Sequence, residues 1–564
     1  MNNFSVAAVF SNHMVLQRNK IISIFGYADD KVCVKVTLLD SNKNILAYNC
    51  ADSADGRWEV RLAPQAAQQD CEVIVEGPEK IIFNDVAIGE VWLAGGQSNM
   101  EFELHNCTEA SEAMSAPSSN VRFYYTNKIG WKDDHFYEAE RNTCWQTWDS
   151  PNKAAWSAVG YFFAEKLSKD LDCIVGVIGC NWGGTSASAW MRKEYLEKDD
   201  ELRTYLIEQE EATKGKTIEQ QIKEYNDYTI ANDEWQKKCN DLYATVPGIT
   251  WNEIQERLGP CLWPGPKACN NPYRPTGLYD CMLSRILPYT LKGVIWYQGE
   301  SDDHKPGMYA KLFSNMIDNW RTDWNDSQLP FVFVQLTVNR YEQDKDFKHW
   351  CLVREAQEKV HNTVKNAYMV PTMDLGAFND IHPKAKREVG ERLEASAMNN
   401  VYGIPTPKGK VPVLESAISN PPSEDGKNGS ITLSITNAED GFVHKVDEEV
   451  LNNYKNVEQS QGTPLPEDFT GFEIAGSDEV YYPAKFAFGG TEGKLNQIIL
   501  CSNKVTTPVY ARYCWYNYGP VTVFGKNGLP VAPFRACTAP SVYNHNKQSD
   551  TKTEHAEIQQ IMTV

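Results

Sequence analysis

The chain has 564 residues, several times the roughly 150 residues of a typical domain, so we expect two to four domains. Its 42% of hydrophobic residues and 16 tryptophans supply enough apolar side chains for packed cores, which argues against a disordered protein. The 75 acidic and 55 basic residues give a formal net charge of −20. Such a chain would repel phosphate backbones, so we expect no nucleic-acid partner.

The N-terminus and the cysteines bear on the cellular compartment. The start, MNNFSVAAVFSNHMVLQ, lacks the basic region, the long apolar run and the cleavage site of a secretory signal. No stretch approaches the roughly 18 apolar residues of a membrane span, so we expect no membrane partner. The 15 cysteines form no CxxC motif and no cluster with histidine, which argues against a disulfide framework and a metal site. We expect a cytoplasmic protein, or a secreted or periplasmic one if a leader was trimmed from this sequence.

The predicted elements differ from one part of the chain to the next. Residues 1–88 hold short alternating runs such as VCVKVTLLD and CEVIVEG, which predict a small antiparallel β module. Over residues 89–400, apolar strands such as EVWLAGG, CIVGVIG and LKGVIWYQG alternate with helical patterns, which predicts an α/β domain with a mainly parallel sheet. Its charge-rich segment 191–271 predicts a helical insertion. A β-rich region follows over 401–545, and 546–564 form a polar tail.

The first of these central strands is followed by a glycine-rich turn that carries Ser98. In open parallel sheets, ligands bind beyond the carboxyl ends of the strands. A serine in the turn GGQSNM can expose its hydroxyl as a nucleophile, and its backbone N–H can face a developing oxyanion. Capping a helix is the structural alternative for Ser98. The turn lacks the GxSxG pattern of ordinary α/β-hydrolases.

Two further strands end in residues suited to the same chemistry. In GCNWGGT, adjacent glycines let the backbone approach a ligand and offer N–H donors, although they would serve any tight turn. In WYQGES, the amide of Gln298 can donate to an oxyanion. Glu300 can act as a catalytic acid or brace the N–H groups of its loop, and we favour the bracing role.

His382 lies in NDIHP, just before the helical pattern PKAKREVGERLEASA, where Pro383 suits the first helical turn. Histidine titrates near neutral pH, so it can take the proton from Ser98. The structural alternatives are a surface loop position for His382 and a helix cap for Asp380. Together, however, these residues form Ser…Asp…His in sequence order, which the structural alternatives do not predict.

The blocks GQSNM, WGGT, WYQGES and DIHP, in this order, resemble the four blocks of the SGNH-hydrolase superfamily in its sialate O-acetylesterase branch. VFSNHMVLQR, PTGLYDCM and NGLPVAPFR resemble further segments of that family, so the likeness covers most of the chain. It implies an SGNH-type three-layer α/β/α catalytic domain flanked by N- and C-terminal β-rich modules. It also implies a serine esterase that needs no cofactor and no metal and acts on a small acetylated sugar.

The resemblance also implies a role for each matching residue. Ser98 is the nucleophile, His382 is the base, and Asp380 is the acid that orients the histidine. The superfamily's common pattern has an aspartate three residues before the histidine, whereas this chain has Asn379 there. The identity of the acid therefore stays open. The alternatives for it are Glu300 and Asp374.

The expected oxyanion donors are the backbone N–H of Ser98, the N–H of Gly184, preferred over Gly183, and the side chain of Gln298. The residues expected to support this site are Glu300, Gln97 and Asn99. Candidates for contact with the sugar or its carboxylate are Trp182, Arg192 and Arg274.

The resemblance favours O-acetyl esters of sialic acid as substrates. The same catalytic groups would serve acetyl-xylan or another hemicellulose, which is the alternative substrate class. A non-catalytic carbohydrate-binding protein is the alternative of another kind, and the joint presence of Ser98, Gln298 and His382 speaks against it. The sequence does not predict an oligomeric state.

Overall fold

The structure of the chain, a computed structural model, divides into two compact units. The residues that it describes are 4–117, 119–340, 345–422, 428–460, 469–491 and 493–538. Unit 1 comprises Met1–Gln298, Lys311–Phe331 and Lys384–Glu391, and unit 2 comprises Gly299–Ala310, Val332–Pro383 and Arg392–Val564. The polar tail expected over 546–564 lies outside the described residues. Helices and several sheets together confirm a mixed α/β protein.

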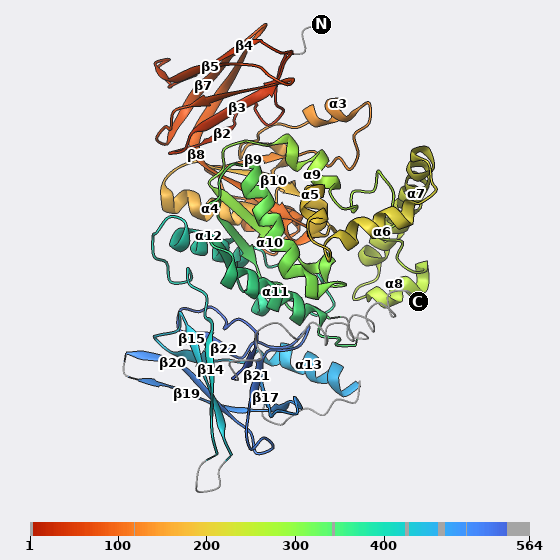
Figure 1. Cartoon of the computed structure of the whole chain (residues 1–564), viewed down its shortest axis with the longest axis vertical. Coiled ribbons are helices and arrows are strands. Elements are labelled where there is room, and N and C mark those ends of the chain that lie inside the picture. The colour runs from red at the N-terminus through yellow and green to blue at the C-terminus, as the bar shows by residue number, and fades with distance from the viewer. Residues whose placement is uncertain are drawn as a thin grey trace. The chain divides into compact units, whose positions relative to one another are not determined.

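The N-terminal strands of unit 1 pair in an antiparallel manner (Figure 1). One sheet contains β1 (Ser5–Val6), β3 (Ile22–Tyr27) and β6 (Arg57–Leu62), and β4 (Cys33–Leu39) pairs with β5 (Ile45–Asp52) and β7 (Gln68–Glu76). Along β6, Trp58, Val60 and Leu62 are buried and the charged residues between them are exposed. This period of two is typical of half-buried strands and explains why the alternating sequence predicts them.

The strand β8 (Lys80–Gly96) joins this antiparallel region to the centre of unit 1. Its first half pairs antiparallel with β7, and its second half pairs parallel with β10 (Val175–Asn181) and β11 (Gly293–Tyr297). Every residue from Val86 to Gly96 is buried, as expected for a strand covered on both faces. One strand therefore runs without a break through residue 88, where the sequence pattern changes.

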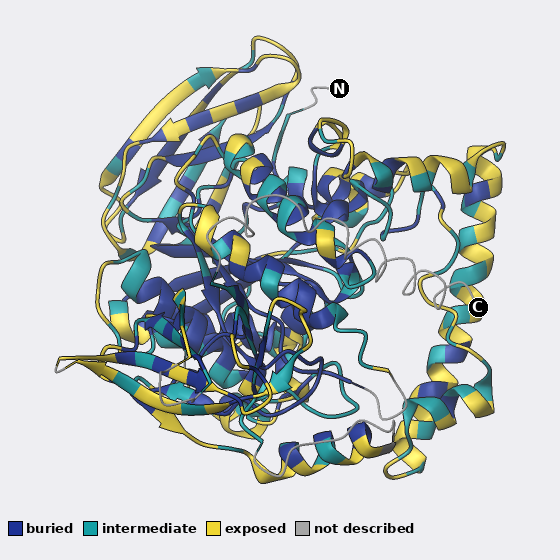
Figure 2. Cartoon of the chain, turned by 60° about the horizontal axis from the view of Figure 1, so that its bottom comes forward, coloured by how far each residue is buried: buried dark blue, intermediate teal, exposed yellow. Residues whose placement is uncertain are grey.

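Four parallel strands of unit 1 lie in the order β9 (Val121–Tyr125), β10, β8, β11. The helix α4 (Ala158–Leu171) packs against β9 and β10. It begins where the Ser157 hydroxyl accepts a hydrogen bond from the Gly160 N–H (2.9 Å), and it ends at Asp172 in the left-handed conformation. Figure 2 shows the central strands almost wholly as buried residues, so side chains can reach a ligand only beyond the strand ends.

The segment 191–271 is helical, and all of its residues are described. It contains α5 (Lys193–Glu197), α6 (Arg203–Thr213), α7 (Ile218–Thr245) and α8 (Trp251–Leu258). The long helix α7 starts at a capping box in which the Thr217 hydroxyl accepts from the Gln220 N–H and the Gln220 side chain accepts from the Thr217 N–H. Trp235 and Cys239 of α7 form a small core with Ile254 of α8, so the insertion has an apolar cluster of its own.

Unit 2 contains the β-rich C-terminal region. One antiparallel sheet has the order β14 (Val413–Asn420), β15 (Ser430–Thr436), β20 (Lys494–Cys501), β19 (Lys485–Thr491). A second has the order β18 (Tyr482–Pro483), β17 (Phe472–Ala475), β21 (Tyr510–Tyr513), β23 (Phe534–Cys537), and β16 (Phe442–His444) pairs with β22 (Val523–Gly525). Buried residues of these strands share one core with α13 (Glu448–Ser460).

The remaining elements are short or lie between those above. They are β2 (Val15–Gln17), α1 (Ser98–Glu101), α2 (Ala110–Met114), α3 (Phe136–Arg141), α9 (Gly277–Cys281), α10 (Pro306–Asp323), β12 (Phe331–Val334), α11 (His349–Thr363), β13 (Ala367–Val370) and α12 (Arg387–Asn400). Within the described ranges, no helix has the length and apolar character that a membrane span requires.

Candidate active site

The carboxyl ends of three strands meet at one edge of the sheet in unit 1. Asn181 at the end of β10 and Tyr297 at the end of β11 both pair with Gly96 at the end of β8. Ser98 follows Gly96 by two residues, and Gln298 follows Tyr297 directly. The register of the strands therefore brings the first three sequence blocks together, although up to 200 residues separate them.

The turn that carries Ser98 requires a glycine before it. Gly96 has a φ of 133°, and a Cβ there would overlap the carbonyl oxygen of Tyr297. The Gln97 N–H donates to that same oxygen (3.0 Å). Gln97 occupies the N-cap position of α1, so Ser98 is the first helical residue and not the helix cap. Ser98 is half-buried, whereas Gln97 and Asn99 on either side of it are buried.

The glycines of the second block lie beside Ser98. A Cβ on Gly183 would lie 3.2 Å from the Cβ of Ser98. The Gly183 N–H donates to Oε2 of Glu101 (2.6 Å) and is therefore already engaged. Gly184 has a φ of 77°, and its N–H has no acceptor among the described residues. Of the two glycines, Gly184 is thus the one whose N–H can serve a ligand.

Gln298 connects the third block to the second. It is completely buried, and its Nε2 donates to the carbonyl oxygen of Thr185 (3.1 Å). Thr185 is itself fixed, because its hydroxyl donates to the carbonyl oxygen of Trp182 (2.7 Å) and accepts from Nε1 of Trp190 (3.0 Å). The side-chain amide of Gln298 has two N–H groups, and the hydrogen bond to Thr185 uses one of them.

A buried lysine that the sequence did not single out contacts the residue after Ser98. Lys386 is 1% exposed, and its Nζ lies 2.6 Å from Oδ1 of Asn99. The ammonium group also lies 4.7 Å from the ring centroid of Phe102 and 5.7 Å from that of Tyr297. Nothing in the local sequence PKAKRE distinguishes this lysine from its neighbours. Its role depends on tertiary contacts alone.

Asp380 and His382 belong to unit 2 and share a local hydrogen bond. The His382 N–H donates to Oδ1 of Asp380 (2.8 Å), and Asn379 before them has a φ of 58°. One carboxylate oxygen of Asp380 thus braces the loop. This is a structural role, similar in kind to the helix cap that was the alternative to a catalytic role for Asp380. The other oxygen is not fixed by this bond. Glu300 also belongs to unit 2, where it is buried at the start of a 3-10 turn.

The helix after His382 starts later than its sequence predicts. Pro383 does not lie in the first helical turn, because α12 begins at Arg387. The backbone before it makes tertiary contacts, since the Lys384 carbonyl accepts from the Thr108 N–H (3.0 Å). The first helical hydrogen bond of this segment runs from the Gly390 N–H to the Lys386 carbonyl (3.1 Å). The prediction for Pro383 was therefore wrong by one helical turn.

The two predicted arginines differ in their partners. Nε of Arg192 donates to the Tyr279 hydroxyl (2.8 Å), and its guanidinium forms an ion pair with the buried Asp323. Arg192 is thus engaged in a structural network. Arg274 lies 5.7 Å from the ring centroid of Trp131, and its Nη1 is buried without a hydrogen-bond partner among the described residues.

Two other predicted residues have clear neighbours. Asp374, one alternative for the triad acid, accepts two hydrogen bonds from Arg392 (2.8 and 2.6 Å), so both of its oxygens are occupied. The Nζ of Lys128 lies 5.6 Å from the ring centroid of Trp182 and is ion-paired with Glu101.

In the described part of the chain, no group of three or more His, Cys, Asp or Glu residues is arranged to hold a metal ion.

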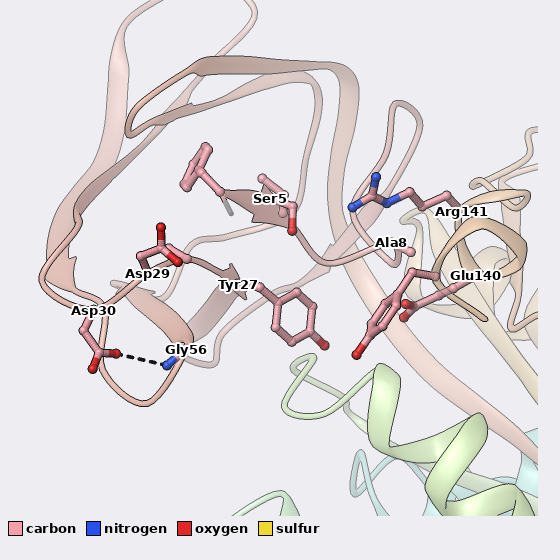
Figure 3. A pocket seen from close by; sticks show the side chains of 12 residues that line it. Ser5, Ala8, Tyr27, Asp29, Asp30, Gly56, Glu140 and Arg141 are labelled. Carbon is pink, nitrogen blue, oxygen red and sulfur yellow. Dashed lines mark hydrogen bonds between the residues drawn. The ribbon is translucent and has the colours of Figure 1, made fainter. Parts of the chain in front are cut away.

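A cavity of about 830 Å³ opens against the N-terminal strands of unit 1 (Figure 3). Tyr27, Asp29 and Asp30 line it from the strand side, and Glu140 and Arg141 line it from α3. Glu140 accepts two hydrogen bonds from Arg285 (both 2.8 Å). None of the site residues predicted from the sequence lines this cavity.

Comparisons with known proteins point to one family of esterases. A family model described as a carbohydrate esterase, sialic acid-specific acetylesterase, matches residues 263–399. The chain is 25% identical over 433 residues to the sialate O-acetylesterase of Mus musculus, covering 71% of this chain and 74% of that protein. It is also 25% identical over 433 residues to that of Homo sapiens, covering 71% of each.

A solved structure matches the fold. A carbohydrate acetylesterase from Xanthomonas citri superposes with a TM-score of 0.69 at 24% identity, covering 96% of this chain and 100% of that chain. The resemblance to the sialate O-acetylesterases expected from the four sequence blocks is thereby confirmed, and residues 263–399 match the carbohydrate-esterase family model.

Proposed function

We propose that this protein hydrolyses O-acetyl esters of sialic acid through a covalent acetyl-enzyme on Ser98. The observation that carries the proposal is the assembly at the sheet edge. There the accessible Ser98 lies beside the glycine pair, and the amide of Gln298 is tied to the same loop. We further propose that the parallel strands of unit 1 are the centre of a three-layer α/β/α catalytic domain of the SGNH type.

The reaction begins when the Ser98 hydroxyl oxygen attacks the acetyl carbonyl carbon and His382 accepts the hydroxyl proton. The carbonyl oxygen becomes an oxyanion, which the N–H groups of Ser98 and Gly184 and the Gln298 amide stabilise. Each such donor contributes roughly 3 kcal/mol to transition-state stabilisation. The ester bond then breaks, and the sugar oxygen leaves with the proton from His382. A water molecule, deprotonated by His382, releases acetate and restores Ser98.

The chain path supports His382 as the base. Lys386 follows His382 by four positions, and its side chain binds Asn99, the neighbour of Ser98. With consecutive Cα atoms about 3.8 Å apart, such a link allows a span of at most about 15 Å between His382 and Lys386. A link of this length is short enough to allow His382 to act as the base for Ser98.

Asp380 is the acid that we propose for the triad. Its bond to the His382 N–H leaves the second carboxylate oxygen available to accept from the imidazole. Of the two alternatives, Asp374 has weaker support because Arg392 engages both of its oxygens. Glu300 stays the alternative acid.

The test is the release of acetate from a panel of 9-O-acetylated sialic acid, 6-O-acetylglucose and acetyl-xylan. We expect the highest kcat/KM on the sialic acid ester and no turnover by the Ser98→Ala variant. A preference for acetyl-xylan would assign the protein to hemicellulose instead. If the wild-type protein binds these sugars but releases no acetate, the protein is a binding module and the proposal fails.

A further inference from the structure

A tryptophan from the end of the helical insertion lies against the second sequence block. A Cβ on Gly184 would lie 3.0 Å from both Cζ2 and Nε1 of Trp263 and 3.2 Å from its Cε2. The edge of the indole is therefore in van der Waals contact with the backbone of Gly184. Because Gly183 touches Ser98, the ring lies next to the residues at which the acetyl group would react.

The loop holds Trp263 in a defined position. The buried Asn271 donates to the carbonyl oxygen of Pro266 (2.9 Å), and its Oδ1 accepts from the Tyr273 N–H (2.7 Å). The ring of Tyr273 meets that of Trp263 edge to face, with centroids 5.7 Å apart and an interplanar angle of 80°. Burial raises the pKa of Tyr273, so its phenol stays neutral and the aromatic pair carries no charge.

The insertion supports this loop from outside. Gly265 has a φ of 75°, and a Cβ there would overlap the ring of Tyr228 on α7. The loop thus packs closely on the long helix. This contact gives the insertion a physical connection to Trp263 and, through it, to Gly184.

Trp263 is nevertheless open to solvent. It is 44% exposed, and of the sixteen tryptophans, all of which lie in the described part of the chain, it is the only exposed one. A large ring that is fixed on one edge and exposed elsewhere loses little conformational freedom when a ligand covers it. Aromatic rings with one apolar face open are what ligand pockets use to hold the apolar side of a molecule.

We propose that Trp263 forms the platform of a sugar subsite, on which the C–H face of the substrate's pyranose ring packs while its acetyl group reaches Ser98. The proposal rests on the esterase function given above. It adds the residue that makes the enzyme prefer an ester of a sugar over a small ester that has no sugar ring. The charged pair of Glu101 and Lys128 borders the same loop, because Glu101 accepts from the Gly183 N–H. Sugar hydroxyls and a carboxylate would find polar partners there.

The experiment compares two esters in the full-length protein. The first is 9-O-acetylated sialic acid, and the second is vinyl acetate, which has no ring to stack. For Trp263→Ala we expect the ratio of kcat/KM on the sugar ester to kcat/KM on vinyl acetate to fall about tenfold or more, mainly through KM. Trp263→Phe should recover part of this ratio. Leu262→Ala, an exposed neighbour on the same loop, is the matched control and should keep the wild-type ratio.

The outcomes separate the subsite from the esterase function. An equal loss on both esters would mean that Trp263 only covers Gly184, and no loss on either would mean that it is a bystander; both overturn the subsite. A wild-type protein that hydrolyses neither ester would instead overturn the esterase function. In that case calorimetric titration of 9-O-acetylated sialic acid into Ser98→Ala, with and without Trp263→Ala, still decides: equal affinities would refute the subsite.

Discussion

The Nζ of Lys386 lies 2.6 Å from Oδ1 of Asn99, the residue directly after Ser98. Both side chains are buried, so the hydrogen bond is formed away from water and by a charged donor. This bond, together with the contacts of Lys386 to Phe102 and Tyr297, fixes the turn that presents Ser98. Lys386 is therefore a positioning residue in this scheme.

Replacing Lys386 should loosen the Ser98 turn. Lys386→Met keeps the apolar stem and removes the donor, so we expect kcat on an acetyl ester to fall about tenfold or more with a small change in KM. Lys384→Met is the control, because its side chain is exposed two residues earlier. Steady-state kinetics of both variants, with circular dichroism to verify folding, give the answer. Wild-type kcat in a folded Lys386→Met protein would remove the positioning role.

The second prediction concerns Gly184→Ala. The substitution combines a left-handed backbone with a Cβ placed 3.0 Å from the Trp263 ring, so the N–H of residue 184 must shift. We expect kcat to fall roughly 10²-fold, the typical cost of losing one oxyanion donor. Gly215→Ala has a similar φ of 79° with no atom within 4 Å of the new Cβ. This control carries the backbone strain alone, and similar kinetic losses in the two variants would argue against an oxyanion role for Gly184.

The third prediction separates the two roles of Asp380. Asp380→Asn keeps an oxygen that can accept from the His382 N–H, whereas Asp380→Ala removes it. If Asp380 is the triad acid, both variants should lose kcat by about 10²–10⁴-fold. Only the alanine variant should also lose about 1 kcal/mol of stability, seen as a lower melting temperature. Near-wild-type turnover in Asp380→Asn, with a large loss in Glu300→Gln, would transfer the role to Glu300.

The fourth prediction uses a buried acid of α11. Burial, with a smaller contribution from the charge of Glu355, raises the pKa of Glu358 to about 8. The folded protein therefore holds a proton there that the unfolded chain releases above its ordinary pKa of 4.5. The associated stability is fully present below pH 4.5 and is lost progressively as the pH rises from 4.5 to about 8.

Glu358→Gln removes this titration and keeps the shape of the side chain. Its melting temperature should therefore exceed that of the wild-type protein at pH 8.5, by an amount equivalent to at most about 5 kcal/mol. The difference should shrink at about pH 5, where the unfolded chain has released its proton only in part. Glu473→Gln, which breaks a partly exposed pair with Arg512 and does not contribute to the pKa of Glu358, should show no such trend. A constant difference between the two pH values would contradict the assignment.

Local sequence patterns predicted the parts of the site that depend on strand ends. The apolar run before Gly95 and Gly96 identified the buried strand, and the glycines identified the turn. Both the burial of a strand and the conformation of a tight turn depend on residues only a few positions apart. The same reasoning applied to Gln298, which follows an apolar run of five buried residues. For Gly184, both the resemblance and its available N–H point to the same residue.

Other residues could not be predicted in this way because their environment comes from distant segments. Lys386 is buried only because Asn99, Phe102 and Tyr297 surround it. Trp263 lies in an irregular loop whose proximity to Gly184 no periodicity encodes. The predicted start of α12 was wrong because the backbone at Lys384 makes a tertiary contact where a helical turn was expected after Pro383.

The continuity of β8 has a mechanical consequence. Its pairing with β7 begins at Lys80, opposite Glu76, and its pairing with β10 and β11 ends at Gly96, two residues before Ser98. All 17 residues form one continuous strand, so the backbone that pairs with the N-terminal strands is the same backbone that leads into the Ser98 turn. Cutting the chain at residue 88 would divide that strand in its middle and leave the half that carries the Ser98 turn held mainly by β10 and β11. The N-terminal region is in this sense an anchor for the Ser98 turn and not an interchangeable attachment.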